Sequence, residues 1–233
     1  MKRLSIVIPA YNEERFIGTL LERILAVDLM PHGLEKELVV VDDCSKDATS
    51  AVAMQFPGVV VCRHQHNGGK GRAVRTGIER ATGDYVMIQD ADLEYDPQDY
   101  GAMVATLLAG RADAVYGSRY TKGLFGSKYP QQSWPAYLGG RSLSLAALAC
   151  TGRYLTDTVT ALKLFPRALL NELNLETTGF ELDHEITSKV IARKLRIVEV
   201  PIRYFPRSRA EGKKIGAGDW LTGLRTFWRY RRG

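Results

Sequence analysis

The sequence lacks any apolar run close to the roughly 20 residues that a membrane-spanning helix needs. Its longest stretch of small and apolar residues, from Leu143 to Cys150, is far too short for such a span. The N-terminus enters a strand-like run directly and has neither the apolar core nor the cleavage site of a secretory signal peptide. From these absences we expect no membrane-spanning helix and no secretion.

Cysteine is also scarce, since the 233 residues include only Cys44, Cys62 and Cys150. An odd number of cysteines without the spacing of metal ligands argues against a disulfide framework and against a zinc site. This usage favours the reducing cytoplasm. The sequence contains no internal repeat and no low-complexity segment, and its length fits one large domain, with or without a C-terminal appendage.

Charge is unevenly distributed, although 45% hydrophobic and 25% charged residues are ordinary for a soluble protein. The net charge is +6, yet residues 203–233 contain nine lysines and arginines against two acidic residues, a local charge of +7. The body before this tail is therefore nearly neutral. A basic tail can meet nucleic acid, anionic lipid or a phosphorylated substrate, and charge alone does not choose among them.

Short apolar runs alternate with amphipathic segments over the first half of the chain. We predict strands over residues 5–9, 37–43, 59–62, 83–92 and 112–116, and helices over 16–24, 47–56, 72–82 and 97–108. We expect Pro9 to break the first strand. Strands that alternate with helices predict an α/β fold, a doubly wound and mostly parallel sheet with helices on both faces.

The second half of the chain is less regular. We predict a loop over 123–135, helices over 136–150 and 182–195, an extended segment over 159–165 and an edge strand over 196–205 that Pro201 interrupts. In a last helix, Trp220, Leu224 and Phe227 share one face, and the opposite face carries arginines. A basic amphipathic helix of this kind suits a membrane interface.

Acidic or polar residues follow three of the predicted strands, and the most prominent are Asp90 and Asp92. In extended backbone, residues two apart point the same way, so both carboxylates can face one hard cation such as Mg²⁺ or Mn²⁺. Each acid alone is more often a turn or helix-capping residue. Parallel strands, however, bring such ends to one edge of the sheet, where ligands bind in open α/β folds. Three such ends predict a site for a nucleotide with a metal-bound diphosphate.

The motifs at these ends resemble those of family 2 glycosyltransferases, and more narrowly the dolichol-phosphate mannose and polyprenyl-phosphate glucose synthases. The chain contains, in the family's order, PAYNE (9–13), VDDCS (41–45), NGGKG (67–71), DADLE (90–94) and GSR (117–119). Further matches are DTVTALKLF (157–165), GFELDHE (179–185), and Arg207 followed by EGKKI (211–215). Each motif is weak alone, but the ordered set is specific and spans essentially the whole chain.

The resemblance implies a single GT-A domain over residues 1–205, with a nucleotide-binding half in about 1–120 and an acceptor half in about 121–205. Residues 206–233 would form a basic segment that closes the site and contacts the membrane. The implied reaction moves a hexose from a UDP- or GDP-linked donor, with inversion at the anomeric carbon, to polyprenyl phosphate. The implied cofactor is Mg²⁺ or Mn²⁺, and the implied place is the cytoplasmic face of a membrane. No nucleic-acid partner is expected.

The resemblance also assigns site residues. Asp92 would bind the metal, with Glu94 as a further oxygen ligand. The nucleotide-sugar would be bound by Pro9, Tyr11, Glu13, Asp42, Lys70, Asp90, Arg207 and Lys213. Glu94 departs from the glutamine of the mannosyl branch, which leaves the donor sugar open. Lys70 lies in a glycine-rich loop without Walker spacing, so nucleotide hydrolysis is not expected.

The acceptor decides which further residues are catalytic. A hydroxyl acceptor must lose a proton, and Asp183 is the candidate base, although an acid at a helix start is also favoured by the helix dipole. A phosphate acceptor is already anionic because its second pKa is about 6, so it needs guiding cations, for which Arg119 and then Arg141 are candidates. Two alternatives remain open: a glycosyltransferase for a hydroxyl acceptor such as a glycan or small metabolite, and a non-catalytic module that binds membrane or nucleic acid.

Overall fold

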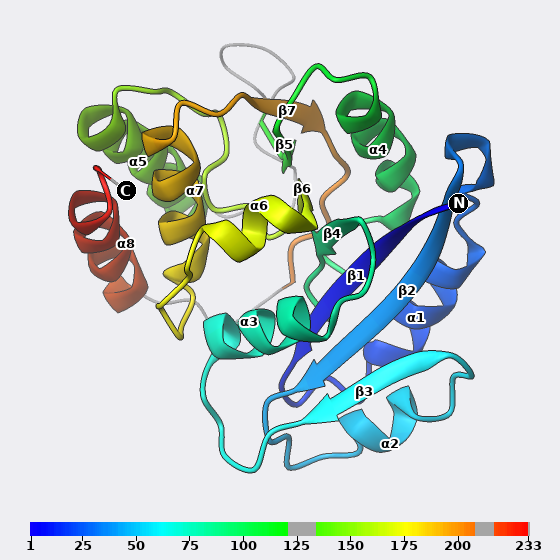
Figure 1. Ribbon diagram of the computed structural model, residues 1–233. Helices are drawn as coiled ribbons and strands as arrows, with labels where there is room; N and C mark the ends of the chain where they lie inside the picture. Colours follow the sequence, from blue (N-terminus) through cyan, green and yellow to red (C-terminus); the bar gives the residue numbers. More distant parts are fainter. Residues whose placement is uncertain (121–133, 208–216, 233) are drawn as a thin grey trace.

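The computed structural model describes residues 1–120, 134–207 and 217–232. A seven-stranded sheet in the order β3-β2-β1-β4-β6-β5-β7 forms its centre (Figure 1). The strands are β1 Lys2–Ala10, β2 Leu34–Asp42, β3 Val59–Arg63, β4 Tyr85–Ile88, β5 Ala114–Ser118, β6 Lys163–Pro166 and β7 Ile197–Pro201. Only β6 runs antiparallel to its neighbours. The predicted mostly parallel sheet is confirmed.

Helices cover both faces of this sheet (Figure 1). They are α1 Ile17–Ala26, α2 Thr49–Ala53, α3 Lys70–Arg80, α4 Tyr100–Leu108, α5 Trp134–Thr151, α6 Arg167–Glu172, α7 Leu182–Ala192 and α8 Ala217–Arg229, with 3-10 helices at Met30–His32 and Pro97–Asp99. The first core cluster joins one face of the sheet to α1 and α4. The second joins the other face to α3, α6 and α7.

The central strand β1 shows why the fold has two layers of helices. Its side chains alternate, so Ile6 and Ile8 lie in the cluster with α1 and α4, while Val7 lies in the cluster with α3 and α7. Helix α3 approaches β1 closely at Gly77, where a Cβ atom would lie 2.2 Å from Val7 Cγ1. Burial on both faces explains the near-continuous apolar run of this strand.

Several predicted boundaries are wrong. Pro9 does not break the first strand, which continues to Ala10 with Pro9 opposite Val41, because proline removes only one donor from the ladder. The helix predicted over 47–56 covers only Thr49–Ala53. The extended segment predicted over 159–165 pairs only at Lys163–Pro166, and its antiparallel direction was not predicted because an apolar run carries no signal for direction. Strand β7 is an edge strand, as predicted, but it ends at Pro201 and does not continue to residue 205.

Helices α5 and α8 pack together outside α7. Trp220, Leu224 and Phe227 of α8 contact the cluster that includes Leu143 and Ala147 of α5. The predicted apolar face therefore exists, and it packs against α5. Contact of α8 with a membrane stays a prediction. The loop predicted over 123–135 lies largely outside the described residues, and α5 already begins at Trp134. No helix in the described ranges has the length and apolar character that crossing a bilayer requires.

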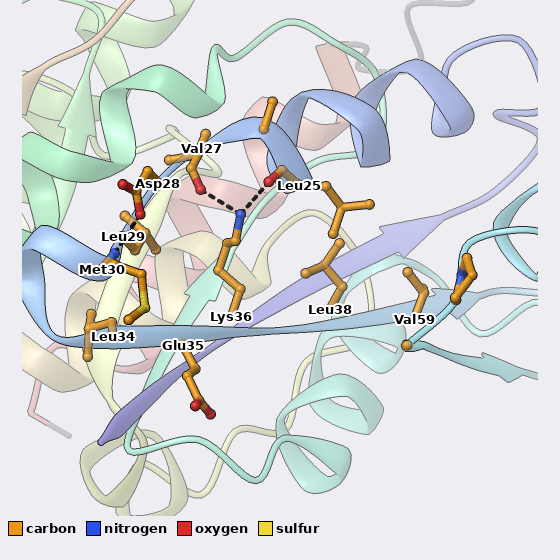
Figure 2. A pocket seen from close by; sticks show the side chains of 13 residues that line it. Leu25, Val27, Asp28, Leu29, Met30, Leu34, Glu35, Lys36, Leu38 and Val59 are labelled. Atoms are coloured by element: carbon orange, nitrogen blue, oxygen red, sulfur yellow. Dashed lines mark hydrogen bonds between the residues drawn. The ribbon is translucent and has the colours of Figure 1, made fainter.

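A cavity of about 560 Å³ lies beside the start of β2 and the end of α1 (Figure 2). The Lys36 ammonium group donates hydrogen bonds there to the carbonyl oxygens of Leu25 at 2.7 Å and Val27 at 2.5 Å. The Lys36 side chain thus donates hydrogen bonds to carbonyl oxygens at the C-terminal end of α1, where helix geometry leaves the last carbonyl groups without an intrahelical partner. This cavity lies at the amino ends of the parallel strands, opposite the edge where the predicted site residues gather, and has no part in that site.

Candidate active site

The loops that follow β1, β2 and β4 share an unusual backbone feature. Each contains a non-glycine residue with positive φ: Asn12 at 55°, Cys44 at 65° and Leu93 at 60°. Side chains with a Cβ adopt this region rarely, and it persists where surrounding contacts enforce it. Leu93 separates Asp92 from Glu94, so its turn sets the direction of two carboxylates. The three loops therefore adopt specific turns along one edge of the sheet.

Arg207 joins two of these loops. Its guanidinium lies 3.0 Å from the Glu13 carboxylate and 2.9 Å from the Asp92 carboxylate. Its backbone N–H donates to Glu94 Oε1 at 2.9 Å. Four residues predicted at the donor site are thus brought together, because a cation from the C-terminal segment meets acids that follow β1 and β4.

The carboxylates around Asp92 carry more negative charge than the single guanidinium of Arg207 balances. Burial, followed by the neighbouring Asp90 and Glu94 carboxylates, raises the pKa of Asp92 to about 7, although Arg207 opposes this shift. A carboxylate in such surroundings favours a further cation. The residues therefore fit Mg²⁺ or Mn²⁺, which bind hard oxygen ligands. No cluster of three His, Cys, Asp or Glu side chains with metal-binding geometry occurs within the described ranges. Magnesium sites commonly combine one or two carboxylates with substrate phosphates.

Besides its predicted role as a metal ligand, Glu94 accepts hydrogen bonds from the C-terminal segment. Its Oε2 accepts a hydrogen bond from the Tyr204 hydroxyl at 2.7 Å, and its Oε1 accepts the Arg207 N–H. Its own carbonyl accepts from the Phe205 N–H at 2.8 Å. Glu94 thus fastens the C-terminal segment to the loop after β4. Any contact of Glu94 with a metal stays a prediction.

A second charged network crosses the site beside the first. Lys70 Nζ lies 2.8 Å from Asp90 Oδ1 and 3.3 Å from Asp183 Oδ2, and Lys163 Nζ lies 2.5 Å from Asp183 Oδ1. Charges therefore alternate from the end of β4, through the start of α3 and the start of α7, to β6. Lys163 is fully buried, so its ammonium group depends on Asp183 for charge compensation.

This network bears on the predicted base. Burial alone would raise the pKa of Asp183, but the Lys163 and Lys70 ammonium groups outweigh burial and hold that pKa below its ordinary value. A carboxylate with a lowered pKa is a poor proton acceptor. The geometry therefore favours Asp183 as the residue that positions two lysines, rather than as a general base.

The predicted acceptor cations lie together around one aromatic ring. Arg119 pairs with Asp157 through two contacts, Nε to Oδ2 at 2.6 Å and Nη2 to Oδ1 at 2.7 Å. Its guanidinium lies 4.9 Å from the Tyr204 ring centroid and 5.4 Å from that of Tyr120. The Arg141 guanidinium also lies 5.7 Å from the Tyr120 ring centroid. Arg119 and Arg141 are 22 positions apart in sequence, yet both lie over Tyr120.

Asp43, which belongs to the VDDCS motif, and His64 had no role assigned to them from the sequence, and they organise the glycine-rich loop. Asp43 accepts hydrogen bonds from the Gly69 N–H at 2.7 Å and from the His64 ring at 2.7 Å. Gly69 has φ of +87°, and a Cβ there would lie 2.5 Å from the Thr178 carbonyl oxygen. The clamp between Asp43 and His64 therefore fixes the turn from which Lys70 begins α3.

Asp42, Pro9 and Tyr11 were also predicted to contact the nucleotide, and the structure places them in buried or half-buried positions. The Asp42 carboxylate is buried, where it accepts hydrogen bonds from the Ser45 N–H at 2.8 Å and the Ser50 hydroxyl, and Arg63 lies 3.4 Å away. Asp42 thus holds the turn after β2. Pro9 is buried near the end of β1, and Tyr11 is half-buried just beyond it. Lys213 lies outside the described residues.

Two further site residues had weak sequence signals. Lys163 is a lone lysine inside the apolar run 161–165, a pattern that indicates a buried partner of opposite charge. Asp157 opens a motif of the resemblance but had no role assigned to it. Its bidentate contact with Arg119 joins positions 38 apart, which the sequence does not connect.

The model of Glycosyl transferase family 2 matches residues 5–173 of the chain. The chain belongs to this family. A dolichol-phosphate mannosyltransferase of Pyrococcus furiosus is 31% identical over 92% of this chain and 60% of its own length. A dodecaprenyl-phosphate galacturonate synthase of Rhizobium johnstonii is 35% identical over 74% of this chain and 50% of its own length. This family 2 glycosyltransferase thus spans between half and three fifths of these two relatives.

Solved structures support the fold. A glucosyl-3-phosphoglycerate synthase of Mycobacterium tuberculosis in complex with UDP superposes with a TM-score of 0.73 and 21% identity, covering 99% of this chain and 80% of that chain. The same enzyme with Mn²⁺, UDP and phosphoglyceric acid gives a TM-score of 0.72 and 20% identity, over 99% and 78%. The predicted GT-A fold is confirmed, and the alternative of a non-catalytic module is wrong for this glycosyltransferase.

Proposed function

We propose that this glycosyltransferase moves a hexose from a UDP- or GDP-linked sugar to polyprenyl phosphate, with a divalent cation and with inversion at the anomeric carbon. One observation carries the proposal: the acids after β1 and β4 meet Arg207 and Lys70 at the edge of the sheet, beside the separate arginine cluster at Tyr120. The first group suits a metal-bound diphosphate and the second a phosphate acceptor. The names of the two relatives support a polyprenyl-phosphate acceptor, and the UDP and Mn²⁺ in the solved neighbour support a nucleotide-linked donor with a divalent cation.

Asp92, with Glu94 beside it, would hold Mg²⁺ or Mn²⁺ in this proposal. The bound ion supplies a Lewis acid for the charge that develops on the departing diphosphate. Lys70 and Arg207 add cationic contacts to phosphate oxygens, and the guanidinium can make two parallel hydrogen bonds. Pro9, Tyr11, Glu13, Asp42 and Asp90 would surround the nucleotide, and Lys213 would reach it from the C-terminal segment.

The reaction then needs no general base. An oxygen of the acceptor phosphate attacks the anomeric carbon, the bond from that carbon to the diphosphate breaks, and the diphosphate leaves with the electron pair. The attacking oxygen is already anionic near neutral pH, so no proton has to move. Arg119 and Arg141 would hold the acceptor phosphate, and the low pKa of Asp183 agrees with this because a hydroxyl acceptor would require a stronger base.

A turnover assay tests the proposal and separates it from the hydroxyl-acceptor alternative. Purified protein is incubated with Mn²⁺, a panel of UDP- and GDP-sugars, and either a short-chain polyprenyl phosphate or the matching polyprenol. We expect transfer to the phosphate and none to the alcohol. Transfer only to alcohols, glycans or small soluble metabolites contradicts the proposed acceptor. The acceptor's lipid nature also leads us to propose peripheral contact with the cytoplasmic face of a membrane, with no nucleic-acid partner.

A further inference from the structure

Apolar side chains are exposed on the outer faces of α5 and α8. Leu138 and Leu145 of α5 are each 59% exposed, and Leu221 and Trp228 of α8 are 52% and 61% exposed. Each pair is separated by seven residues, which is close to two helical turns, so each pair shares one face of its helix. Together these four side chains form what we term the α5/α8 surface.

The two helices lie side by side, and their inner faces are already covered (Figure 1). Trp220 Nε1 donates a hydrogen bond to Ser142 Oγ at 2.8 Å, and Phe227 packs into the cluster with Leu143 and Ala147. These contacts use the faces turned toward the protein. The α5/α8 surface therefore remains as an apolar strip on neighbouring helices, distinct from the face that the hydrophobic pattern predicts.

Arginines are interleaved with the exposed apolar residues of α8. Arg225 lies four residues after Leu221 within α8, which places it beside the apolar strip. Arg232 follows in the turn after α8, and both arginines are exposed. The Arg231 guanidinium lies 3.7 Å from the Trp228 ring centroid. Tryptophan and leucine flanked by arginine are typical of helices that lie in the interface of an anionic bilayer. Anionic lipids attract each such cation near their surface.

The position of Arg141 links this surface to the active site. Arg141 belongs to α5, between Leu138 and Leu145, and contacts the Tyr120 ring that Arg119 also contacts. A headgroup phosphate at the level of α5 would thus meet the two guanidinium groups proposed to hold the acceptor. Docking on a second copy of the chain gives no reason for this adjacency, whereas docking on a bilayer does.

We propose that the α5/α8 surface docks on an anionic lipid bilayer and presents the arginine cluster to lipid-linked phosphate. This inference rests on the proposed function, because that function places the acceptor in a bilayer. It differs from the sequence prediction in its surface, since Leu221 and Trp228 replace the face formed by Trp220, Leu224 and Phe227.

Cosedimentation with vesicles tests the docking. The probes are vesicles of phosphatidylcholine alone and of phosphatidylcholine mixed with phosphatidylglycerol, without donor or acceptor. We expect binding to the mixed vesicles and a loss of about tenfold in partition for L221S/W228S, because both side chains enter the interface. The control M54S removes an apolar side chain that is 62% exposed beyond α2 and should bind as wild type.

A charge reversal tests the lipid specificity. R225E/R232E should abolish the preference for phosphatidylglycerol, whereas R23E on the exposed side of α1 should not. Equal partition of L221S/W228S and wild type overturns the proposal. So does the absence of vesicle binding together with a dimer, seen by light scattering, that L221S/W228S dissociates.

Binding and turnover can fail separately. L221S/W228S should retain wild-type turnover of short-chain polyprenyl phosphate in detergent, where docking is not needed. If wild type binds mixed vesicles through this surface but transfers no sugar to polyprenyl phosphate, the proposed function is wrong and the docking surface stands. If it transfers sugar in detergent but the surface variants bind vesicles unchanged, only the docking surface is wrong.

Discussion

Arg207 and Asp92 form an ion pair in which the guanidinium Nη2 lies 2.9 Å from the carboxylate Oδ2, although 115 positions separate them. The chain thus supplies its own cation to the carboxylate that we propose as the metal ligand. The same guanidinium holds Glu13 at 3.0 Å, so both sides of the proposed donor site depend on it. A metal ion and Arg207 would compete for Asp92, and this competition has measurable consequences.

Asp92→Asn should lower metal-dependent turnover by about 100-fold or more, because it removes a charge that stabilises the departing diphosphate through the metal. The substitution should not reduce the melting temperature, since burial beside Asp90 and Glu94 disfavours the ionised Asp92 side chain. Turnover is measured across a Mn²⁺ titration, and melting by calorimetry. Asp28→Asn at an exposed position is the matched control. Wild-type turnover of the Asp92→Asn variant would remove the central element of the proposed site.

Arg207→Gln should tighten Mn²⁺ binding in the absence of nucleotide, because no guanidinium then competes for Asp92. The same variant should turn over about tenfold to a hundredfold more slowly, since it lacks a bidentate phosphate contact. Titration calorimetry with Mn²⁺ measures the first effect. Arg203→Gln is the control, because Arg203 lies nearby but pairs with Asp99 at the surface. Weaker Mn²⁺ binding by Arg207→Gln would show that the arginine supports the metal site and does not compete with it.

The sequence was sufficient for the parts of the site that depend on periodicity. An apolar run that ends in Asp90 and Asp92 predicts a strand end, and parallel strands place such ends on one edge. The predicted extent over 83–92 is too long, however, because β4 ends at Ile88 and Asp92 lies in the turn that follows, so the two carboxylates do not share extended backbone. The pairing of Asp183 with Lys163 could not be predicted from the sequence. It depends on the antiparallel direction of β6, and an apolar run carries no signal for strand direction. For α8, periodicity identified the residues that share a face, but it could not show that α5 covers that face.

Asp183→Asn should destabilise the protein by about 3 kcal/mol, because it leaves the fully buried Lys163 ammonium group without a counter-charge. Adding Lys163→Met should restore most of that loss, since the double variant buries no unpaired charge. Unfolding by urea measures both. Phosphate-acceptor turnover should recover only in part, because Lys70 keeps its contact with Asp90 but still lacks the one with Asp183. A double variant that is stable but completely inactive would instead favour a direct chemical role for Asp183, as a hydroxyl acceptor requires, because Asp90 still holds Lys70.

His184 should make the protein sensitive to acid. Its ring is buried 4.8 Å from the Phe227 ring, and within the described part of the chain its Nδ1 has no hydrogen-bond partner. Burial lowers the pKa of His184 from 6.5 to about 4, opposed by Asp183 and reinforced by Lys163 and Lys70. Between these two pH values the unfolded chain binds a proton that the native protein does not. The free energy of unfolding should therefore fall by up to about 3 kcal/mol as the pH drops from 6.5 to 4, and this contribution is fully present above 6.5.

His184→Gln isolates this contribution, because glutamine is polar, of similar size and does not titrate. Urea unfolding at several pH values across this window should give a shallower loss of stability for His184→Gln than for wild type, whatever the variant's stability at neutral pH. His66→Gln changes an exposed histidine and should leave the slope as it is. Parallel slopes for wild type and His184→Gln would mean that His184 takes up its proton in the native protein as readily as in the unfolded chain. Water or a counter-charge would then have to reach the His184 ring where α7 packs against Phe227 of α8.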